Sequence, residues 1–347
     1  MPSYFLPHVD RMAGYMPGEQ PRGGDVVKLN TNENPYPPSP KAVEAVRAAA
    51  LTSLRRYPDP VGAAFREVAA RHHGVDPSMI LAGNGSDDLL TIITRAFVGP
   101  GDVAASATPS YILYRTLTEL QNASLVDVPF RPDWSLDPGA FSSSSNRLAY
   151  LANPNSPSGT CLEPGAVAEV AARCPCPLVV DEAYADFAGS DCVSLVRDHP
   201  NVIVTRSFSK GYSLAGLRLG YLIARPEMVE GLVKVKDSYN CDALSLAGAA
   251  AALEDQEYHR STRDKVLATR RRLSDAARGL GFTVPESRAN FVWCTGRPDA
   301  AGLYEALKER RVLVRLMRYG HAEPGLRITV GTDEEIDLLL GHLRTFV

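Results

Sequence analysis

Short apolar runs alternate with helical segments between residues 80 and 223, and this alternation is the strongest constraint on the fold. Runs rich in Val, Ile, Leu and Ala are typical of buried strands, and most of the stretches between them have the composition of amphipathic helices. Such an alternation predicts an α/β domain whose central sheet is mostly parallel. The expected strands are Ile80–Ala82, Val103–Ala105, Leu125–Val128, Leu148–Leu151, Leu178–Val180, Val202–Thr205 and Leu219–Ile223.

The chain before this block has a different character. Residues 14–40 are rich in Gly and Pro, which predicts an extended arm followed by irregular, turn-forming chain. Two helices should come next, one over residues 42–54 with Ser39 as its N-cap and one over residues 61–73 that ends at Gly74.

A long charged helix over residues 255–279 separates the alternating block from a C-terminal α+β segment. The last helix should begin at a capping box formed by Thr332 and Glu335. We therefore expect an arm over residues 1–38 that also begins the small domain, a large domain over residues 39–252 and a small domain over residues 253–347. The strands expected in the small domain are Asn290–Cys294, Val312–Val314 and Leu326–Val330.

Composition excludes several classes of protein. The 347 residues carry a net charge of −3 with no basic or acidic block, so neither nucleic acid nor an anionic membrane is expected as the main partner. No apolar run reaches membrane-spanning length, and residues 1–8 do not resemble a signal peptide. The six cysteines lack metal-ligand spacing, so we expect no metal site. Scattered thiols are typical of a reducing compartment, and we expect a soluble, cytoplasmic, metabolic protein.

Lys210 lies in a group of residues that suits one cofactor. It stands between Ser207 and Arg218, and it follows the expected strand that ends at Asp181 and Tyr184. An amine can form a Schiff base, hydroxyls and an arginine suit a phosphate, and a carboxylate and a phenol suit a pyridinium ring. Pyridoxal 5′-phosphate is the ligand that needs all of these protein groups at once, so it is the cofactor that the residues predict.

The turn from Gly83 to Ser86 follows a strand and opens a helix, so its backbone N–H groups suit a phosphate. It is not the dinucleotide fingerprint, because Asp88 stands where the third glycine would fall. Taken alone, a Gly-Asn-Gly turn is more often purely structural.

Each of the other residues also has a simpler interpretation. Asp181 alone suits the N-cap of a helix, and Lys210 alone suits a solvated surface lysine. Ser207 and Lys210 match the SxxK spacing of serine acyl-enzymes, but the Lys-Thr-Gly element of that class is absent from the sequence. Arg327 lies in an apolar strand, where it suits either an anionic substrate group or an internal salt bridge.

Taken in order, these segments resemble the fold-type I pyridoxal-phosphate aminotransferases, and among them the histidinol-phosphate aminotransferase family. The resemblance covers essentially the whole chain. Each segment is weakly specific alone, and their order and spacing carry the resemblance. The segments are Tyr15–Gly18, Leu29–Pro35, Arg56–Pro58, Gly83–Asp88, Pro109–Tyr111, Asn153–Gly159, Asp181–Tyr184, Ser207–Arg218, Ala289–Phe291 and Leu326–Thr332.

The resemblance implies a role for each matching residue. Lys210 would carry the Schiff base and move the proton between the substrate Cα and the cofactor. Asp181 would pair with the pyridine nitrogen, Tyr184 would bind the phenolic oxygen, and Tyr111 would stack on the ring. The other residues implied to bind the cofactor, most of them at its phosphate, are Gly85, Ser86, Asp87, Asn155, Ser156, Ser207, Ser209, Arg218 and, from a partner subunit, Tyr57.

The same resemblance implies a substrate site and one departure from the family. Arg315 and Arg327 would bind the anionic end of the substrate together with Asn34 and with Tyr15, which would reach across a dimer. The family usually has Asn where this chain has Ser156. The shorter serine leaves three alternatives for the bond to the phenolic oxygen: it is lost, bridged by water, or replaced by one from Asn155.

The implied reaction is ping-pong transamination between histidinol phosphate or imidazole acetol phosphate and glutamate or 2-oxoglutarate, as in histidine biosynthesis. The implied assembly is a homodimer with shared active sites. Two alternatives remain on the same scaffold, an aromatic amino-acid aminotransferase and a threonine-phosphate decarboxylase. A regulator with this fold would need an added DNA-binding module, for which the chain has no room.

Overall fold

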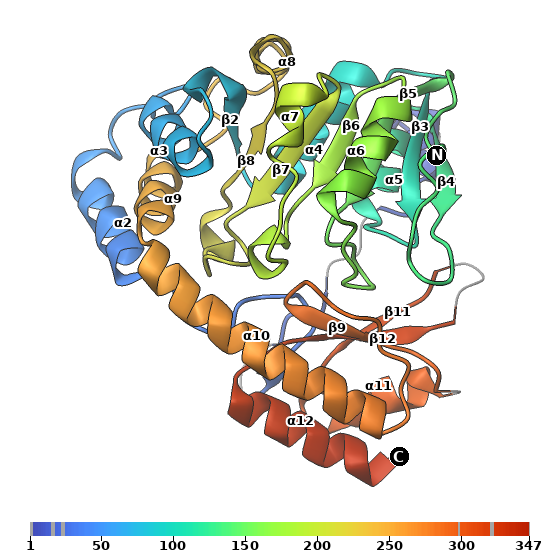
Figure 1. The fold of residues 1–347 in the computed structure, drawn as a ribbon. Helices are drawn as coiled ribbons and strands as arrows, with labels where there is room; N and C mark the ends of the chain where they lie inside the picture. The colour runs from blue at the N-terminus through green and yellow to red at the C-terminus, as the bar shows by residue number, and fades with distance from the viewer. Residues whose placement is uncertain (1–2, 15–17, 22–24, 298, 320–322, 347) are drawn as a thin grey trace.

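The computed structural model describes residues 3–14, 18–21, 25–297, 299–319 and 323–346. They form two units, a large one around a seven-stranded sheet and a small one around a three-stranded sheet (Figure 1). Helix α10 (Gln256–Gly279) leads from the first unit into the second. The expected α/β architecture is confirmed, whereas the domain boundaries at residues 38/39 and 252/253 stay a prediction.

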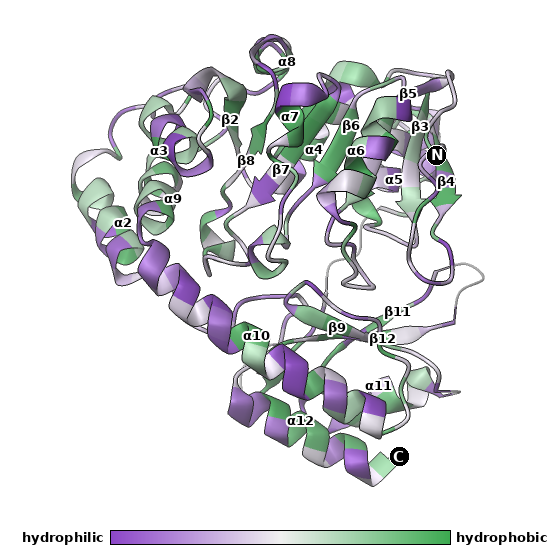
Figure 2. Ribbon diagram, viewed as in Figure 1, coloured by the Kyte–Doolittle hydropathy of each residue, from purple (hydrophilic) through white to green (hydrophobic). Residues whose placement is uncertain are grey.

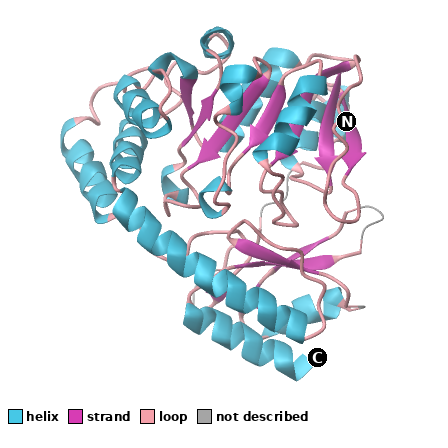
Figure 3. Cartoon of the chain, viewed as in Figure 1, coloured by secondary structure: helices cyan, strands magenta, loops and turns pink. Residues whose placement is uncertain are grey.

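The large sheet has the strand order β2-β8-β7-β6-β5-β3-β4. The strands from β4 to β7 pair in parallel, and β8 runs antiparallel to both of its neighbours. All seven expected strands are confirmed (Figure 3). Their bounds are β2 Ile80–Gly83, β3 Val103–Thr108, β4 Ser124–Pro129, β5 Asn146–Ala152, β6 Leu178–Asp181, β7 Val202–Ser207 and β8 Gly220–Ile223.

Alternate residues of the large sheet enter two separate cores. Leu178 and Val180 of β6 belong to one core, and Val179 belongs to the other. The first core is covered by α3 (Ala63–His73), α6 (Pro164–Arg173), α7 (Leu195–Asp198) and α9 (Ala243–Glu254). The second is covered by α4 (Ser86–Phe97), α5 (Leu113–Leu120) and α8 (Pro226–Val233). Because side chains alternate along a strand, Asp181 shares the face of Val179.

The helices before the sheet largely agree with expectation. Helix α2 (Pro40–Thr52) is capped by Ser39, whose hydroxyl accepts from the backbone N–H of Lys41 at 3.1 Å. Helix α3 ends at Gly74 in the left-handed conformation (φ 63°), as its glycine predicts. It begins two residues later than expected because Gly62, also left-handed at φ 62°, precedes it.

The small unit contains an antiparallel sheet in the order β11 (Arg315–Met317), β12 (Gly325–Thr329), β9 (Phe291–Cys294). The sheet forms one core with the apolar faces of three helices, α10, α11 (Ala300–Glu309) and α12 (Asp333–Phe346). The predicted capping box is confirmed: Glu335 N–H donates to Thr332 Oγ1 at 3.3 Å, and Thr332 N–H donates to Glu335 Oε2 at 2.8 Å.

The strand expected at residues 312–314 is confirmed as β10 (Val312–Leu313), which is one residue shorter than expected. It pairs in parallel with β1 (Val27–Lys28) and does not join the three-stranded sheet. The next strand in the sheet is instead β11, which begins at Arg315. The pairing of β1 with β10 attaches residues 27–28 to the small unit. The residues that follow β1 then lie between the two sheets.

Hydropathy follows these layers. The strands of the large sheet are predominantly apolar, whereas hydrophilic residues predominate in α10 (Figure 2). No helix of the described residues combines the length and the apolar character needed to span a bilayer. The remaining short elements are α1 (Pro7–Arg11) and the 3-10 turns η1 (Pro77–Met79), η2 (Ala185–Phe187) and η3 (Ala215–Leu217).

A buried ion-pair cluster joins β7 to the chain after β6. Arg206 lies in β7, and its Nη1 is 3.0 Å from Glu182 Oε2 while its Nη2 is 2.9 Å from Asp186 Oδ1. All three side chains are less than one-tenth exposed. Two carboxylates beside one guanidinium keep the segment from residue 182 to residue 186 against the sheet.

We expect Arg206→Met to lower the free energy of unfolding by about 3–5 kcal/mol, because it leaves two buried carboxylates without their cation. Equilibrium urea unfolding measures the change. The matched control is Arg131→Met, since Arg131 pairs with Asp137 at 3.1 Å with both side chains more than half exposed. Loss of that pair should cost less than about 1 kcal/mol, and equal losses in the two variants would contradict the prediction.

Candidate active site

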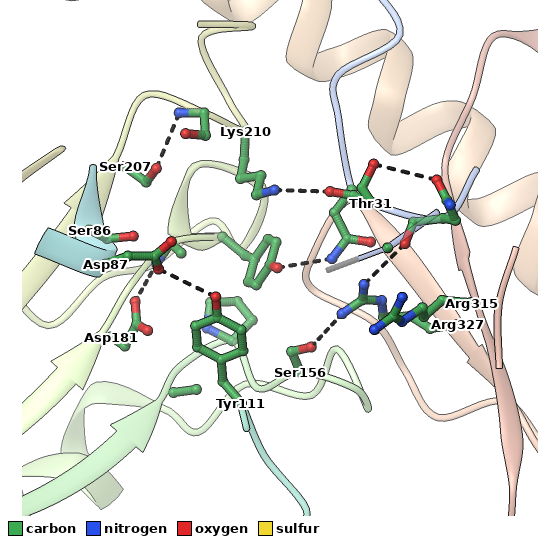
Figure 4. Close-up of a pocket in the computed structure, with 18 of the residues that line it drawn as sticks. Thr31, Ser86, Asp87, Tyr111, Ser156, Asp181, Ser207, Lys210, Arg315 and Arg327 are labelled. Carbon is green, nitrogen blue, oxygen red and sulfur yellow. Dashed lines mark hydrogen bonds between the residues drawn. The ribbon is translucent and has the colours of Figure 1, made fainter. Parts of the chain in front are cut away.

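A cavity of about 160 Å³ lies at the carboxyl ends of β5, β6 and β7, bounded on the other side by the small unit (Figure 4). In open α/β sheets this is the edge where ligands bind. The lining includes twelve of the residues singled out from the sequence. They are Ser86, Asp87, Tyr111, Ser156, Asp181, Tyr184, Ser207, Ser209, Lys210, Arg218, Arg315 and Arg327.

Asp181 ends β6 and is 5% exposed, so its carboxylate depends on protein donors. Oδ2 accepts from the hydroxyl of Tyr114 at 2.7 Å, and Oδ1 accepts from Thr205 Oγ1 and from the backbone N–H of Ala183, both at 3.2 Å. Burial raises the pKa of Asp181, and the hydrogen bonds from Tyr114, Ala183 and Thr205 oppose that shift. A buried carboxylate in this position favours a cationic partner.

Lys210 follows β7, and its amine points across the cavity toward the segment after β1 (Figure 4). Its Nζ donates to the carbonyl of Thr31 at 3.1 Å. Burial, and then the positive charge of Arg327, lower the pKa of Lys210 to about 8. The neutral, nucleophilic form of the amine is therefore far more populated near neutral pH than for an ordinary lysine.

The N-terminus of α4 and the loop after β7 form a polar cradle. Gly85 precedes α4 with φ 82°, a positive value that favours glycine, and a Cβ there would lie 2.7 Å from Arg218 Nη2, so a larger residue would displace the guanidinium from its place at the helix start. Arg218 Nη1 donates to Ser209 Oγ at 3.2 Å, and Nη2 lies 3.4 Å from Asp87 Oδ2. Helix N–H groups, serine hydroxyls and a guanidinium together suit a phosphate.

Arg315 and Arg327 are directly paired residues of β11 and β12, so their side chains share one face of the small sheet. Arg327 donates from Nη1 to Ser156 Oγ at 2.9 Å and from Nη2 to the carbonyl of Asn30 at 3.3 Å. Its guanidinium lies 5.3 Å from the ring centre of Phe291. The Nε of Arg327 is buried and has no hydrogen-bond partner within the described ranges. Two adjacent guanidinium groups, one with a buried N–H that lacks an acceptor, suit an anion. This favours an anionic substrate group over an internal salt bridge as the partner of Arg327.

Some residues singled out from the sequence lie elsewhere. The Asn155 side chain accepts from Ser110 Oγ and donates to the carbonyl of Pro109 and to Ser158 Oγ, and its role toward the cofactor stays a prediction. Asn34 donates to the carbonyls of Lys210 and Gly211 at 3.1 and 3.2 Å, which holds the lysine loop from outside the cavity. Tyr57 is 80% exposed, stacks on Tyr239 with the ring centres 4.6 Å apart, and is not among the lining residues. Tyr15 lies outside the described residues.

The sequence analysis assigned no role to eight residues of the lining, among them Thr31, Asn32 and Tyr114. Tyr114 lies in α5 without any motif of its own, and only the stacking of α5 on the sheet shows its bond to Asp181. Thr31 and Asn32 lie in a segment that was recognised as irregular chain, and the signal that could have found them was its density of asparagines.

Comparisons with known proteins agree with this geometry. The sequence pattern of aminotransferase class I and II matches residues 24–343. The histidinol-phosphate aminotransferase of Rhodopirellula baltica is 48% identical over 338 residues, which are 96% of this chain and 93% of that protein. Histidinol-phosphate aminotransferase 1 of Nostoc is 45% identical, over 99% of this chain and 98% of that protein.

A solved structure extends the likeness to three dimensions. The Sinorhizobium meliloti histidinol-phosphate aminotransferase in complex with pyridoxal-5′-phosphate superposes with a TM-score of 0.88 at 27% identity, covering 100% of this chain and 99% of that one. Pattern, relatives and architecture coincide over nearly the whole length. The chain belongs to the class I and II aminotransferase family.

Proposed function

We propose that this protein is a pyridoxal-phosphate-dependent aminotransferase that exchanges the amino group of L-histidinol phosphate with 2-oxoglutarate. The observation that carries the proposal is one cavity that joins a desolvated lysine, a buried carboxylate, a phosphate cradle and two adjacent arginines. Relatives that share 45–48% of its residues bear the name of that activity. The enzyme would act in histidine biosynthesis.

The residues present fit the cofactor. Asp181 would pair with the ring nitrogen, whose positive charge would offset the cost of burying the carboxylate. Ser86, Ser207, Ser209 and Arg218 would hold its phosphate at the start of α4. When bound, pyridoxal phosphate supplies a carbonyl that condenses with amines and a ring that accepts electron density.

Lys210 would act as the base and acid at the substrate Cα. With its pKa lowered to about 8, Nζ can both accept and return a proton near neutral pH. Its bond to the Thr31 carbonyl and the two bonds from Asn34 to the lysine loop limit the directions in which Nζ can move. Holding the amine in place supplies part of the rate enhancement, because the reacting atoms are pre-positioned.

Arg315 and Arg327 would bind the anionic end of each substrate in turn, the phosphate of histidinol phosphate and a carboxylate of glutamate. Both anions accept paired N–H bonds from guanidinium groups. The aromatic alternative needs an apolar pocket for the side chain, yet the residues that the small unit and the segment after β1 add to the lining are polar or charged, namely Asn30, Thr31, Asn32, Arg315 and Arg327. That composition favours the polar, phosphorylated substrate.

A second copy of the chain would complete the site. Exposed apolar residues gather on α2 and on the turn that follows it, where Leu51, Leu54 and Tyr57 are 82%, 68% and 80% exposed. A surface of this kind is typical of a protein interface. Pairing through this surface would bring Tyr57 to the phosphate of the partner's cofactor and would give the homodimer with shared active sites.

The direct test is a single half-reaction. We expect the visible absorbance of the cofactor-loaded protein to bleach rapidly with L-histidinol phosphate and to return with 2-oxoglutarate. L-histidinol, which lacks the phosphate, is the matched control and should react far more slowly. Faster bleaching by phenylalanine would assign aromatic transamination, and release of CO₂ from threonine phosphate would assign decarboxylation. Absence of a visible band after adding the cofactor would contradict the cofactor itself.

The anion site can be tested separately. Arg327→Lys should lower kcat/KM for L-histidinol phosphate roughly 100-fold, or about 2.7 kcal/mol, because a lysine cannot make paired bonds to the phosphate. Steady-state kinetics measure the loss. Arg260→Gln, an exposed charge change on α10, is the control and should leave kcat/KM within about twofold. An Arg327→Lys enzyme with unchanged kcat/KM would place the anion elsewhere.

The lowered pKa of Lys210 predicts a pH-dependent stability of the cofactor-free protein. Below about pH 8 the amine is charged in both states, so the folded protein bears the full cost of its burial. Between about pH 8 and pH 10.5, which is the ordinary pKa of a lysine, the amine stays protonated in the unfolded chain but loses its proton in the folded protein. The free energy of unfolding therefore rises with pH in this range. We expect Lys210→Met to stabilise the protein at pH 7 by on the order of 1–3 kcal/mol, with a smaller gain as the pH approaches 10.

Urea unfolding at pH 7 and pH 9.5 measures this difference. Lys234→Met, at an exposed position after α8, is the control and should change stability little at either pH. A wild-type protein more stable than Lys210→Met at pH 7 would show that the lysine is not desolvated.

A further inference from the structure

Asn32 contacts the tyrosine of the site from the small unit. It lies in the segment after β1, is 1% exposed, and lines the cavity. Its Nδ2 donates to the hydroxyl of Tyr184 at 2.9 Å. Residues 32 and 184 belong to different units, so this bond forms only when the two units are packed together.

The orientation of the Asn32 amide follows from its other contacts. The backbone N–H of Asn32 donates to Thr329 Oγ1 at 3.0 Å, and the Thr329 hydroxyl donates to Asn32 Oδ1 at 3.2 Å. A hydroxyl has one proton to give, and here the amide oxygen receives it. With Oδ1 on Thr329, Nδ2 faces Tyr184 and must be the donor of that bond.

The backbone of Asn32 is equally constrained. Its φ of 57° lies in the left-handed region, which asparagine and glycine adopt more readily than other residues. Asn290 Nδ2 donates to its carbonyl at 2.9 Å. Three contacts from the small unit, two from Thr329 and one from Asn290, therefore hold a residue whose side chain faces the large unit.

The bond sets the direction of hydrogen bonding at Tyr184. Because its oxygen accepts from Asn32, the hydroxyl proton of Tyr184 is not used in that bond, so Tyr184 is a donor and not an acceptor toward any other group that the oxygen meets along its O–H bond. The ring of Tyr184 is also fixed, since it packs edge-on against Phe291 with the ring centres 5.0 Å apart. Both position and polarity of this phenol come from the small unit.

We propose that Asn32 is a positioning residue that makes Tyr184 a hydrogen-bond donor to the phenolic oxygen of pyridoxal phosphate. This inference rests on the proposed function, which supplies the cofactor. A donor at that oxygen stabilises its deprotonated form and lowers the pH at which the bound cofactor loses its proton. Asn32 tunes that pH without touching the cofactor, through Tyr184.

The test is a visible-absorbance pH titration of the cofactor-loaded protein and its variants. Asn32→Asp keeps the shape of the side chain but places a carboxylate where the N–H donor was, so Tyr184 would donate to residue 32 instead. We expect the titration midpoint to rise by about one to two pH units, as for loss of a hydrogen bond to a charged group. Thr329→Val, which frees the amide to turn, should raise the midpoint by less.

Two controls separate positioning from mere structure. Asn32→Gly removes the amide but keeps the left-handed backbone, and Asn122→Gly repeats that change at an exposed position with φ 54°, where the midpoint should not move. In a Tyr184→Phe background, Asn32→Gly should add no further shift, because the phenol through which it acts is gone. A residue that only supported the loop would still shift the midpoint in that background.

The outcomes distinguish the two levels of the proposal. A wild-type protein with a titrating visible band, together with Asn32 variants that titrate as wild type does, would overturn the role of Asn32 and leave the proposed function intact. An additional shift from Asn32→Gly in the Tyr184→Phe background would also overturn it. A wild-type protein that acquires no visible band would overturn the proposed function and this inference with it.

Discussion

Burial of ionised groups at the carboxyl ends of β6 and β7 is the constraint on which the rest of the structure depends. Side-chain alternation sends Asp181 to one face of the large sheet and Arg206 to the other. A buried charge is tolerated only when protein donors or counter-charges replace water. Tyr114 and Thr205 supply donors on the first face, and Glu182 and Asp186 supply charge on the second. The ends of these two strands are therefore held by side-chain hydrogen bonds on one face and by ion pairs on the other.

The cavity has two chemically different walls because two units build it. The large unit contributes the groups that suit a cofactor, namely Asp181, Lys210 and the start of α4. The small unit contributes paired arginines and the segment after β1, held in place by the pairing of β1 with β10. Arg327 bridges the walls through Ser156, and Asn32 bridges them through Tyr184. These bonds make the geometry of the site depend on the packing of one unit against the other.

Much of this arrangement was predictable from sequence. All seven strands of the large sheet were expected, because buried parallel strands are short apolar runs that need little context. The residues at the ends of those strands were also expected in the cavity, since parallel strands bring their carboxyl ends to one edge. The sequence did not show which strands pair. The strand expected at residues 312–314 is present as Val312–Leu313, but its partner is β1 and not the three-stranded sheet. The hydrogen bonds of the Asn155 amide to Pro109 and Ser158 were not evident from the sequence either.

The sequence by itself determined the α/β class, the order of the elements and the chemical types of group at the edge of the sheet. Apolar periodicity and residue chemistry are local properties that can be read along the chain. Only the tertiary structure decided that Tyr114 supports Asp181, that Ser156 contacts Arg327 and that Asn32 donates to Tyr184. These contacts join residues up to 171 positions apart, and no local pattern encodes them. Burial then gave them their effect, since desolvation shifts the pKa of Lys210 and of Asp181 only inside the folded cavity.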